Sequence, residues 1–112
     1  MVATLLWNSD SIISMRIALK KFGTTLTSRQ AGSEALKAFQ SQLRDTATDE
    51  HVEVDFDGVL TISPSWADEF LTPLIQQFKD RVRLLPSDNL SVQATMHLLQ
   101  EIHKEWLPRI GE

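Results

Sequence analysis

Residues 52–71, VEVDFDGVLTISPSWADEFL, decide how this chain folds. Hydrophobic residues stand at every second position in 52–56, and this period of two is typical of a β-strand with one buried face. Gly58 then permits a bend that other residues resist. From Phe70 onward apolar residues recur at a helical spacing, which predicts an amphipathic helix. The stretch therefore predicts a strand, a turn, a short extended segment and a helix.

The start of that helix carries capping signals. Ser65 and Asp68 have the spacing of a capping box, in which Ser65 would be the N-cap and Asp68 its reciprocal partner. Asp68 and Glu69 also place negative charge in the first turn, which the helix dipole favours. Pro73 predicts either a kink or a short helix followed by a second one, because proline removes a backbone hydrogen bond and clashes with the preceding turn.

Before this stretch the pattern predicts a β-hairpin. Residues 3–7 are apolar, residues 8–10 have turn chemistry, and residues 13–20 alternate between apolar and polar side chains. The same alternating segment leaves open an amphipathic helix capped at Ser9 or Ser11.

A helix is expected next, from Thr27 or Ser28 to about Arg44, with Gln30 at capping-box spacing from Thr27. Downstream of residue 78, residues 81–85 predict a short strand, and hydrophobic residues spaced by three and four from Val92 to Trp106 predict a final helix. The order β-β-α-β-α-β-α predicts the α/β class, with a small mixed sheet flanked by helices.

Composition limits the classes of protein to which this chain could belong. The 112 residues suit a single domain, residues 1–112, and 42% hydrophobic with 23% charged residues is ordinary for a globular protein. The chain has no cysteine, which excludes disulfides and thiolate chemistry and fits a reducing compartment. No secretory signal or membrane-length stretch is present, so we expect a cytoplasmic protein that does not interact with membranes.

Charge and histidine spacing argue against a nucleic-acid-binding protein and against a zinc protein. The formal net charge is −4 and no basic face is visible, so no nucleic-acid partner is expected. The three histidines, His51, His97 and His103, have no zinc spacing, and we expect no metal and no cofactor.

One motif suggests an enzyme. Residues 55–61, DFDGVLT, resemble the opening motif of haloacid-dehalogenase-like phosphatases. This resemblance implies an Mg²⁺-dependent phosphohydrolase with Asp55 as nucleophile and Asp57 as general acid/base. The other motifs of that family are missing, 54 residues precede Asp55, and too few follow it for the remaining strands. The phosphohydrolase is therefore the alternative reading, and we assign no catalytic residues.

A second resemblance covers more of the chain. It is carried by three groups of residues at fixed order and spacing: Gly23, Leu26, Ser28 and Arg29; Asp55, Phe56, Gly58 and Val59; and Ser65, Trp66, Ala67, Asp68 and Glu69. Together they resemble the bacterial STAS-like domain of unknown function, which is distantly similar to the anti-sigma factor antagonists. The resemblance implies a STAS-like fold and a regulatory protein-interaction module rather than an enzyme.

The same resemblance implies a partner and a surface. Antagonist-type STAS domains bind a histidine-kinase-like ATPase, which phosphorylates a serine at the start of the helix after the central strand. Pro64 occupies the usual acceptor position here, so Ser65 is the candidate phosphorylation site. The candidate partner-binding residues are Ser63, Ser65, Trp66, Asp68 and Glu69. A homodimer through an exposed strand or the final helix is a further possibility.

Arg29 stands out because a cation is disfavoured in the first turn of a helix. A specific carboxylate partner would explain it, and an ion pair with Asp55 is the hypothesis. Ser28, Arg29, Asp55 and Gly58 are then structural motif residues, with Asp55 capping the turn after its strand.

Overall fold

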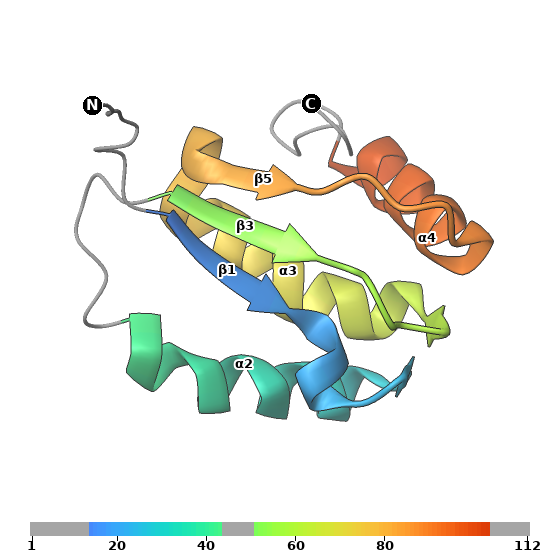
Figure 1. Ribbon diagram of the computed structural model, residues 1–112, viewed down its shortest axis with the longest axis horizontal. Helices are drawn as coiled ribbons and strands as arrows, with labels where there is room; N and C mark the ends of the chain where they lie inside the picture. Colours follow the sequence, from blue (N-terminus) through green and yellow to red (C-terminus); the bar gives the residue numbers. More distant parts are fainter. Residues whose placement is uncertain (1–13, 44–50, 104–112) are drawn as a thin grey trace, which may run out of the picture.

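The computed structural model describes residues 14–43 and 51–103, and it has the expected α/β class (Figure 1). The elements follow in the order β1 (Ser14–Ala18), the 3-10 turn η1 (Leu19–Phe22), β2 (Thr25–Leu26), α2 (Arg29–Leu43), β3 (His51–Asp55), β4 (Thr61–Ile62), α3 (Pro64–Phe78), the 3-10 turn η2 (Lys79–Arg81), β5 (Val82–Leu84) and α4 (Leu90–Ile102).

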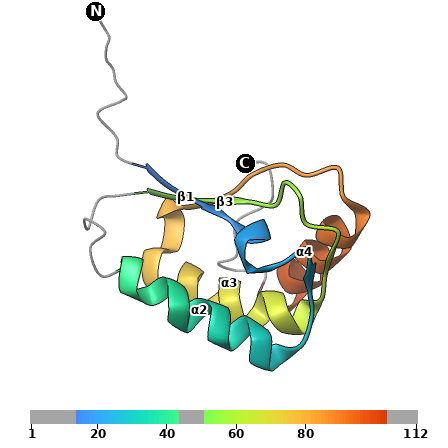
Figure 2. The same cartoon turned by 60° about the horizontal axis from the view of Figure 1, so that its bottom comes forward.

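The strands form two small parallel sheets. The larger has the order β1-β3-β5, with Ile17 beside Val54 and Val54 beside Leu84. The smaller pairs β2 with β4. Helices α2 and α3 lie beneath one face of the larger sheet, and α4 lies beyond the ends at which β3 and β5 finish (Figures 1 and 2). The connections between neighbouring parallel strands are therefore crossovers through α2 and α3.

Residues 14–18 form a strand, so the alternative helix is wrong for this segment. The first strand of the expected hairpin and its turn lie outside the described residues. Both sheets are parallel within the described residues, and the antiparallel pairing expected from the hairpin is a prediction about residues outside them.

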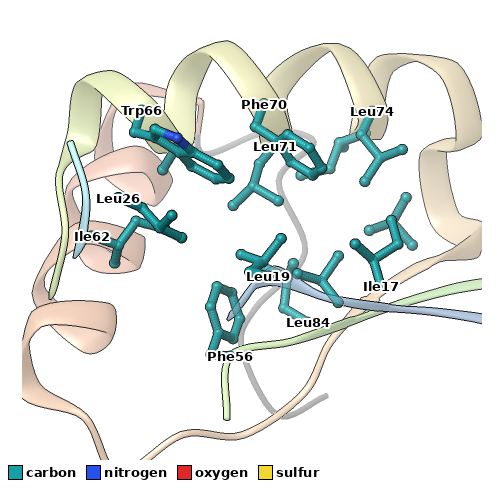
Figure 3. Close-up of a cluster of buried hydrophobic side chains, with 14 of the residues drawn as sticks. Ile17, Leu19, Leu26, Phe56, Ile62, Trp66, Phe70, Leu71, Leu74 and Leu84 are labelled. Atoms are coloured by element: carbon teal, nitrogen blue, oxygen red, sulfur yellow. The ribbon is translucent and has the colours of Figure 1, made fainter. Parts of the chain in front are cut away.

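The core lies between the larger sheet and α3 (Figure 3). The period-of-two pattern predicted which strand residues enter this core, and Val52, Val54 and Phe56 are indeed all buried. Phe70 and Leu74 of α3 lie on the side of that helix that faces the strands, where Ile17 and Leu84 are also labelled. The opposite face of the sheet is polar, with Arg16 donating to Glu53 across neighbouring strands at 3.2 Å. The larger sheet therefore has its apolar side against helices and its polar side away from them.

Helices α2 and α3 pack closely because a glycine lies between them. A Cβ atom built on Gly32 would lie 2.5 Å from the carbonyl oxygen of Trp66, which is nearer than real Cβ contacts occur. Gly32 therefore sets the distance between the amino-terminal turns of the two helices.

Helix α3 runs without interruption through Pro73, so the expectation of two short helices is wrong. Phe70, Leu74 and Phe78 are buried on either side of the proline. Their burial offsets the hydrogen bond that proline cannot donate, at roughly 1.5–3 kcal/mol for each large side chain. Helix α4 ends at Ile102, and the expected continuation to Trp106 lies outside the described residues.

Candidate partner-binding surface

Ser63, not Ser65, caps helix α3. The Oγ of Ser63 accepts the backbone N–H of Trp66 at 3.1 Å, and Pro64 is the first helical residue. Proline suits that position because its φ is already helical and its missing N–H has no partner to lose there. The cap must then be the residue before it, so the expected capping box of Ser65 and Asp68 is wrong.

Ser65 and Trp66 follow in the first turn of α3 and have different environments. Ser65 is half-buried and lies one helical turn before Glu69 on the same face of the helix. Trp66 is 1% exposed, and its ring stacks on Phe70 with 5.0 Å between ring centroids. Trp66 is therefore a core residue in this structure, and its expected role in partner contact stays a prediction.

Arg29 finds its carboxylate partner on α3. Its Nη1 donates to Glu69 Oε2 at 2.6 Å and lies 3.5 Å from Asp68 Oδ2. The hypothesis of an ion pair with Asp55 is wrong, because the close packing at Gly32 brings the first turn of α2 against α3 instead. The hydrogen bonds to Glu69 and then to Asp68 raise the pKa of Arg29, so the guanidinium stays charged.

Asp68 connects three helices. Its Oδ1 accepts the Thr72 hydroxyl at 2.7 Å and lies 3.3 Å from His103 Nε2 at the end of α4, while its Oδ2 faces Arg29. Partial burial raises the pKa of Asp68, but the hydrogen bonds from Thr72, His103 and Arg29 outweigh it and hold that pKa below its ordinary value. Asp68 is therefore ionised at neutral pH.

His103 is a member of this cluster that sequence reasoning missed. It stands 35 residues from Asp68, and no local spacing could connect the two.

Ser28 holds the start of α2 in an unusual conformation. Its Oγ accepts the backbone N–H of Ala31 at 3.1 Å, so Ser28 is the cap and the expected box of Thr27 and Gln30 is wrong. Its φ is +74°, which costs a residue with a Cβ of the order of 1 kcal/mol or more. This strained cap places Arg29 at the α2 end beside α3.

The turn after β3 forms as expected. Asp55 Oδ1 accepts the backbone N–H of Asp57 at 3.0 Å, and Gly58 has a φ of +87°, so the structural roles expected for Asp55 and Gly58 are confirmed. Two loops, residues 56–60 and 86–89, line a cavity of about 380 Å³ that includes Asp57. It lies past the carboxyl ends of β3 and β5, where ligands bind in many parallel sheets.

Across residues 14–43 and 51–103, no three His, Asp or Glu side chains come together in a way that could hold a metal ion. The described part of the chain therefore offers no such cluster of ligands for the Mg²⁺ that the phosphatase resemblance implies.

Comparison with protein families finds one family model that matches part of the chain. Residues 36–89 match the model of the STAS-like domain of unknown function. The searches of curated proteins and of solved structures found no match. The described helices include none with the length and apolar character needed to cross a membrane.

Proposed function

We propose that this chain, whose residues 36–89 match the STAS-like domain of unknown function, is a regulatory protein-interaction module. Its partner in this proposal is a histidine-kinase-like ATPase of a partner-switching system. The observation that carries the proposal is a polar surface, formed by Arg29, Ser63, Ser65, Asp68 and Glu69 at the amino ends of α2 and α3, which we call the amino-end surface.

A binding partner could replace one member of the ion pairs on the amino-end surface, because these charged side chains are partly exposed. The Arg29 side chain is 57% exposed, and those of Asp68 and Glu69 are each 33% exposed. Ion pairs at this exposure contribute little to stability, so an incoming protein could take over one member at small cost. Such partly exposed charges govern the association rate and the choice of partner.

Ser65 is the proposed point of regulation. A phosphate on its hydroxyl would add about two negative charges in the first turn of α3, where the helix dipole favours them. Glu69 lies one turn further on and already holds Arg29. The phosphate would repel Glu69 and compete for Arg29, which changes the charge pattern that a partner meets.

The test begins with capture of the tagged chain from its own cells, followed by calorimetry with the purified ATPase. We expect Glu69→Lys to weaken binding at least tenfold, about 1.4 kcal/mol. Asp80→Lys is the matched control, since it makes the same charge change at the other end of α3, where Asp80 is exposed. Equal affinities for wild type, Glu69→Lys and Asp80→Lys would remove the amino-end surface from the interaction.

Phosphorylation is tested with the same ATPase. We expect mass spectrometry to find a phosphate on the wild-type chain and none on Ser65→Ala. Ser63→Ala is the matched control, because the Oγ of Ser63 already accepts the backbone N–H of Trp66 as the helix cap. A phosphate that persists in Ser65→Ala would contradict the proposed switch while leaving the interaction surface intact.

The alternative function is a phosphohydrolase at the cavity beside Asp57. It is favoured by the position of the cavity past two parallel strands and opposed by Asp55, whose Oδ1 is occupied by the turn. Hydrolysis of p-nitrophenyl phosphate in Mg²⁺, lost in Asp55→Asn, would establish it; equal rates in both proteins would reject it.

The proposed system also places the chain in the cytoplasm, which suits a chain without cysteine. Recovery of the tagged chain with periplasmic or extracellular markers in cell fractionation would contradict this location.

A further inference from the structure

His103 belongs to α4 but contacts the amino-end surface. It stands at the carboxyl end of that helix, where its backbone N–H donates to the Leu99 carbonyl at 2.8 Å. Its Nε2 lies 3.3 Å from Oδ1 of Asp68, which is one of the charged residues of the surface. The His103 side chain is 22% exposed, so this contact is partly shielded from water. A residue outside the amino-end surface therefore touches one of its charges.

The Asp68 carboxylate is held at both of its oxygens. Its Oδ1 accepts the Thr72 hydroxyl at 2.7 Å and lies beside His103, whereas its Oδ2 lies 3.5 Å from Nη1 of Arg29. Arg29 makes its shorter hydrogen bond, 2.6 Å, to Glu69. The direction of the Asp68 carboxylate thus depends mainly on the two groups at Oδ1. Of these two groups, His103 is the one that can change its charge.

The charge of His103 alters the contact with Asp68. A neutral imidazole can donate from Nε2 in only one of its two tautomers, whereas the protonated ring always donates there and adds a positive charge. Histidine changes its charge between about pH 5 and pH 8. Partial burial raises the pKa of Asp68, but its hydrogen bonds outweigh burial and hold that pKa below the ordinary value, so Asp68 stays ionised over this range.

The charges around His103 come from three helices. A positive charge on His103 is attracted by Asp68 of α3 and by the carboxyl end of α4, where the helix dipole is negative. Glu69 of α3 is already paired with Arg29, and Arg29 of α2 repels a second cation. Glu101, exposed two residues earlier on α4, does not share the face of His103. Asp68 is therefore the residue through which a proton on His103 affects the amino-end surface.

We propose that His103 is a positioning residue of the amino-end surface, and that its protonation draws the Asp68 carboxylate toward α4. Arg29 is then held by Glu69 and shares less of Asp68, so a partner meets a different arrangement of the same charges. The effect on binding rests on the proposed ATPase interaction. The pairing of Asp68 with protonated His103 is a property of the isolated chain, so the two are tested separately.

A double-mutant cycle tests the pairing without a partner. From urea denaturation of wild type, Asp68→Asn, His103→Gln and the double variant, we expect a coupling that changes the unfolding constant at least about threefold more at about pH 5.5 than at about pH 8. The sign follows from the charges, because the ion pair forms when His103 is protonated and is lost as pH rises through the histidine range. His97→Gln, at an exposed position of the same helix, is the matched control and should show no coupling to Asp68 at either pH. Equal coupling at both pH values, including none at either, would overturn the proposal.

Binding of the purified ATPase tests the consequence for the surface. We expect its dissociation constant, measured by calorimetry, to change at least about threefold between about pH 6 and about pH 8 for wild type, and less for His103→Gln. His103→Lys stays positively charged over this range and should also lose the pH dependence. An identical pH dependence of wild type and His103→Gln would overturn the positioning role. A chain that binds no ATPase at either pH would contradict the proposed function instead, and the cycle would still decide the pairing.

Discussion

Replacing Gly32 by alanine puts two known effects in opposition. Gly32 lies inside α2, where alanine is better than glycine by about 1 kcal/mol on helix propensity alone. The added Cβ would, however, lie 2.5 Å from the Trp66 carbonyl oxygen and 3.0 Å from its Cα. The sign of the change in stability depends on which effect is larger.

The contact decides in favour of destabilisation. Ordinary Cβ contacts begin at 3.4 Å, so the two helices must separate by about 1 Å to admit the methyl group. The obstructing atoms are backbone, which cannot turn aside as a flexible side chain can. Overpacking of this kind costs about 1–3 kcal/mol, and a backbone obstacle places it in the upper half of that range. Gly32→Ala should therefore lower the free energy of unfolding by about 1–2 kcal/mol after the gain in propensity.

Urea denaturation measures the change. Ala38→Gly, on the exposed side of the same helix, isolates the propensity effect and should cost about 1 kcal/mol. If Gly32→Ala instead stabilised the protein by about the amount that Ala38→Gly costs it, the helices would not be in contact at this point and the packing argument would be refuted.

Three further predictions concern caps and charge. The Asn89 side chain accepts two backbone N–H groups of α4 and donates to the Val59 carbonyl at 2.7 Å. In urea denaturation, Asn89→Ala should lower the free energy of unfolding by about 2–3 kcal/mol, and Asn89→Asp, which keeps the acceptor, should lower it clearly less. Equal losses for the two variants would mean that the cap contributes nothing. Ser63→Ala should cost about 1 kcal/mol and Ser65→Ala less than about 0.5, and the reverse order of midpoints would return the cap to Ser65. Because the pKa of Asp68 is lowered in the folded state, its contribution is present above the unfolded value of about 3.9 and is lost as pH falls through the folded value. Denaturation between pH 3 and pH 6 should therefore show wild type losing more stability on acidification than Asp68→Asn, and identical losses would contradict the pKa assignment.

Local patterns predicted the elements well. The alternation at Val52 and Val54 predicted a half-buried strand, because a strand turns successive side chains to opposite faces. Turn chemistry at Asp55 and Gly58 was also readable, since both roles involve backbone within three residues. The family resemblance, carried by short segments of this kind, is confirmed over residues 36–89.

Helix starts were less well predicted. At α2 the sequence left Thr27 and Ser28 open, and Ser28 is the cap. At α3 the expected Ser65 lies two residues after the real cap, Ser63. Several serines and threonines stand near each helix start, and each offers a similar hydroxyl. At α3 the choice depends on Pro64, whose preference for the first helical position was the signal that could have found Ser63.

The sequence by itself determined which segments become strands and helices, because those preferences depend on the period of apolar residues and on neighbouring backbone. Only the tertiary structure decided which charges meet. Arg29 pairs with Glu69 and Asp68 rather than with Asp55, and His103 joins them from the end of α4. These contacts span 35 to 40 residues, and those of Arg29 follow from the distance between α2 and α3, which depends on the missing side chain at Gly32. A side chain's sequence neighbours govern its backbone, but the packing of helices selects its partner.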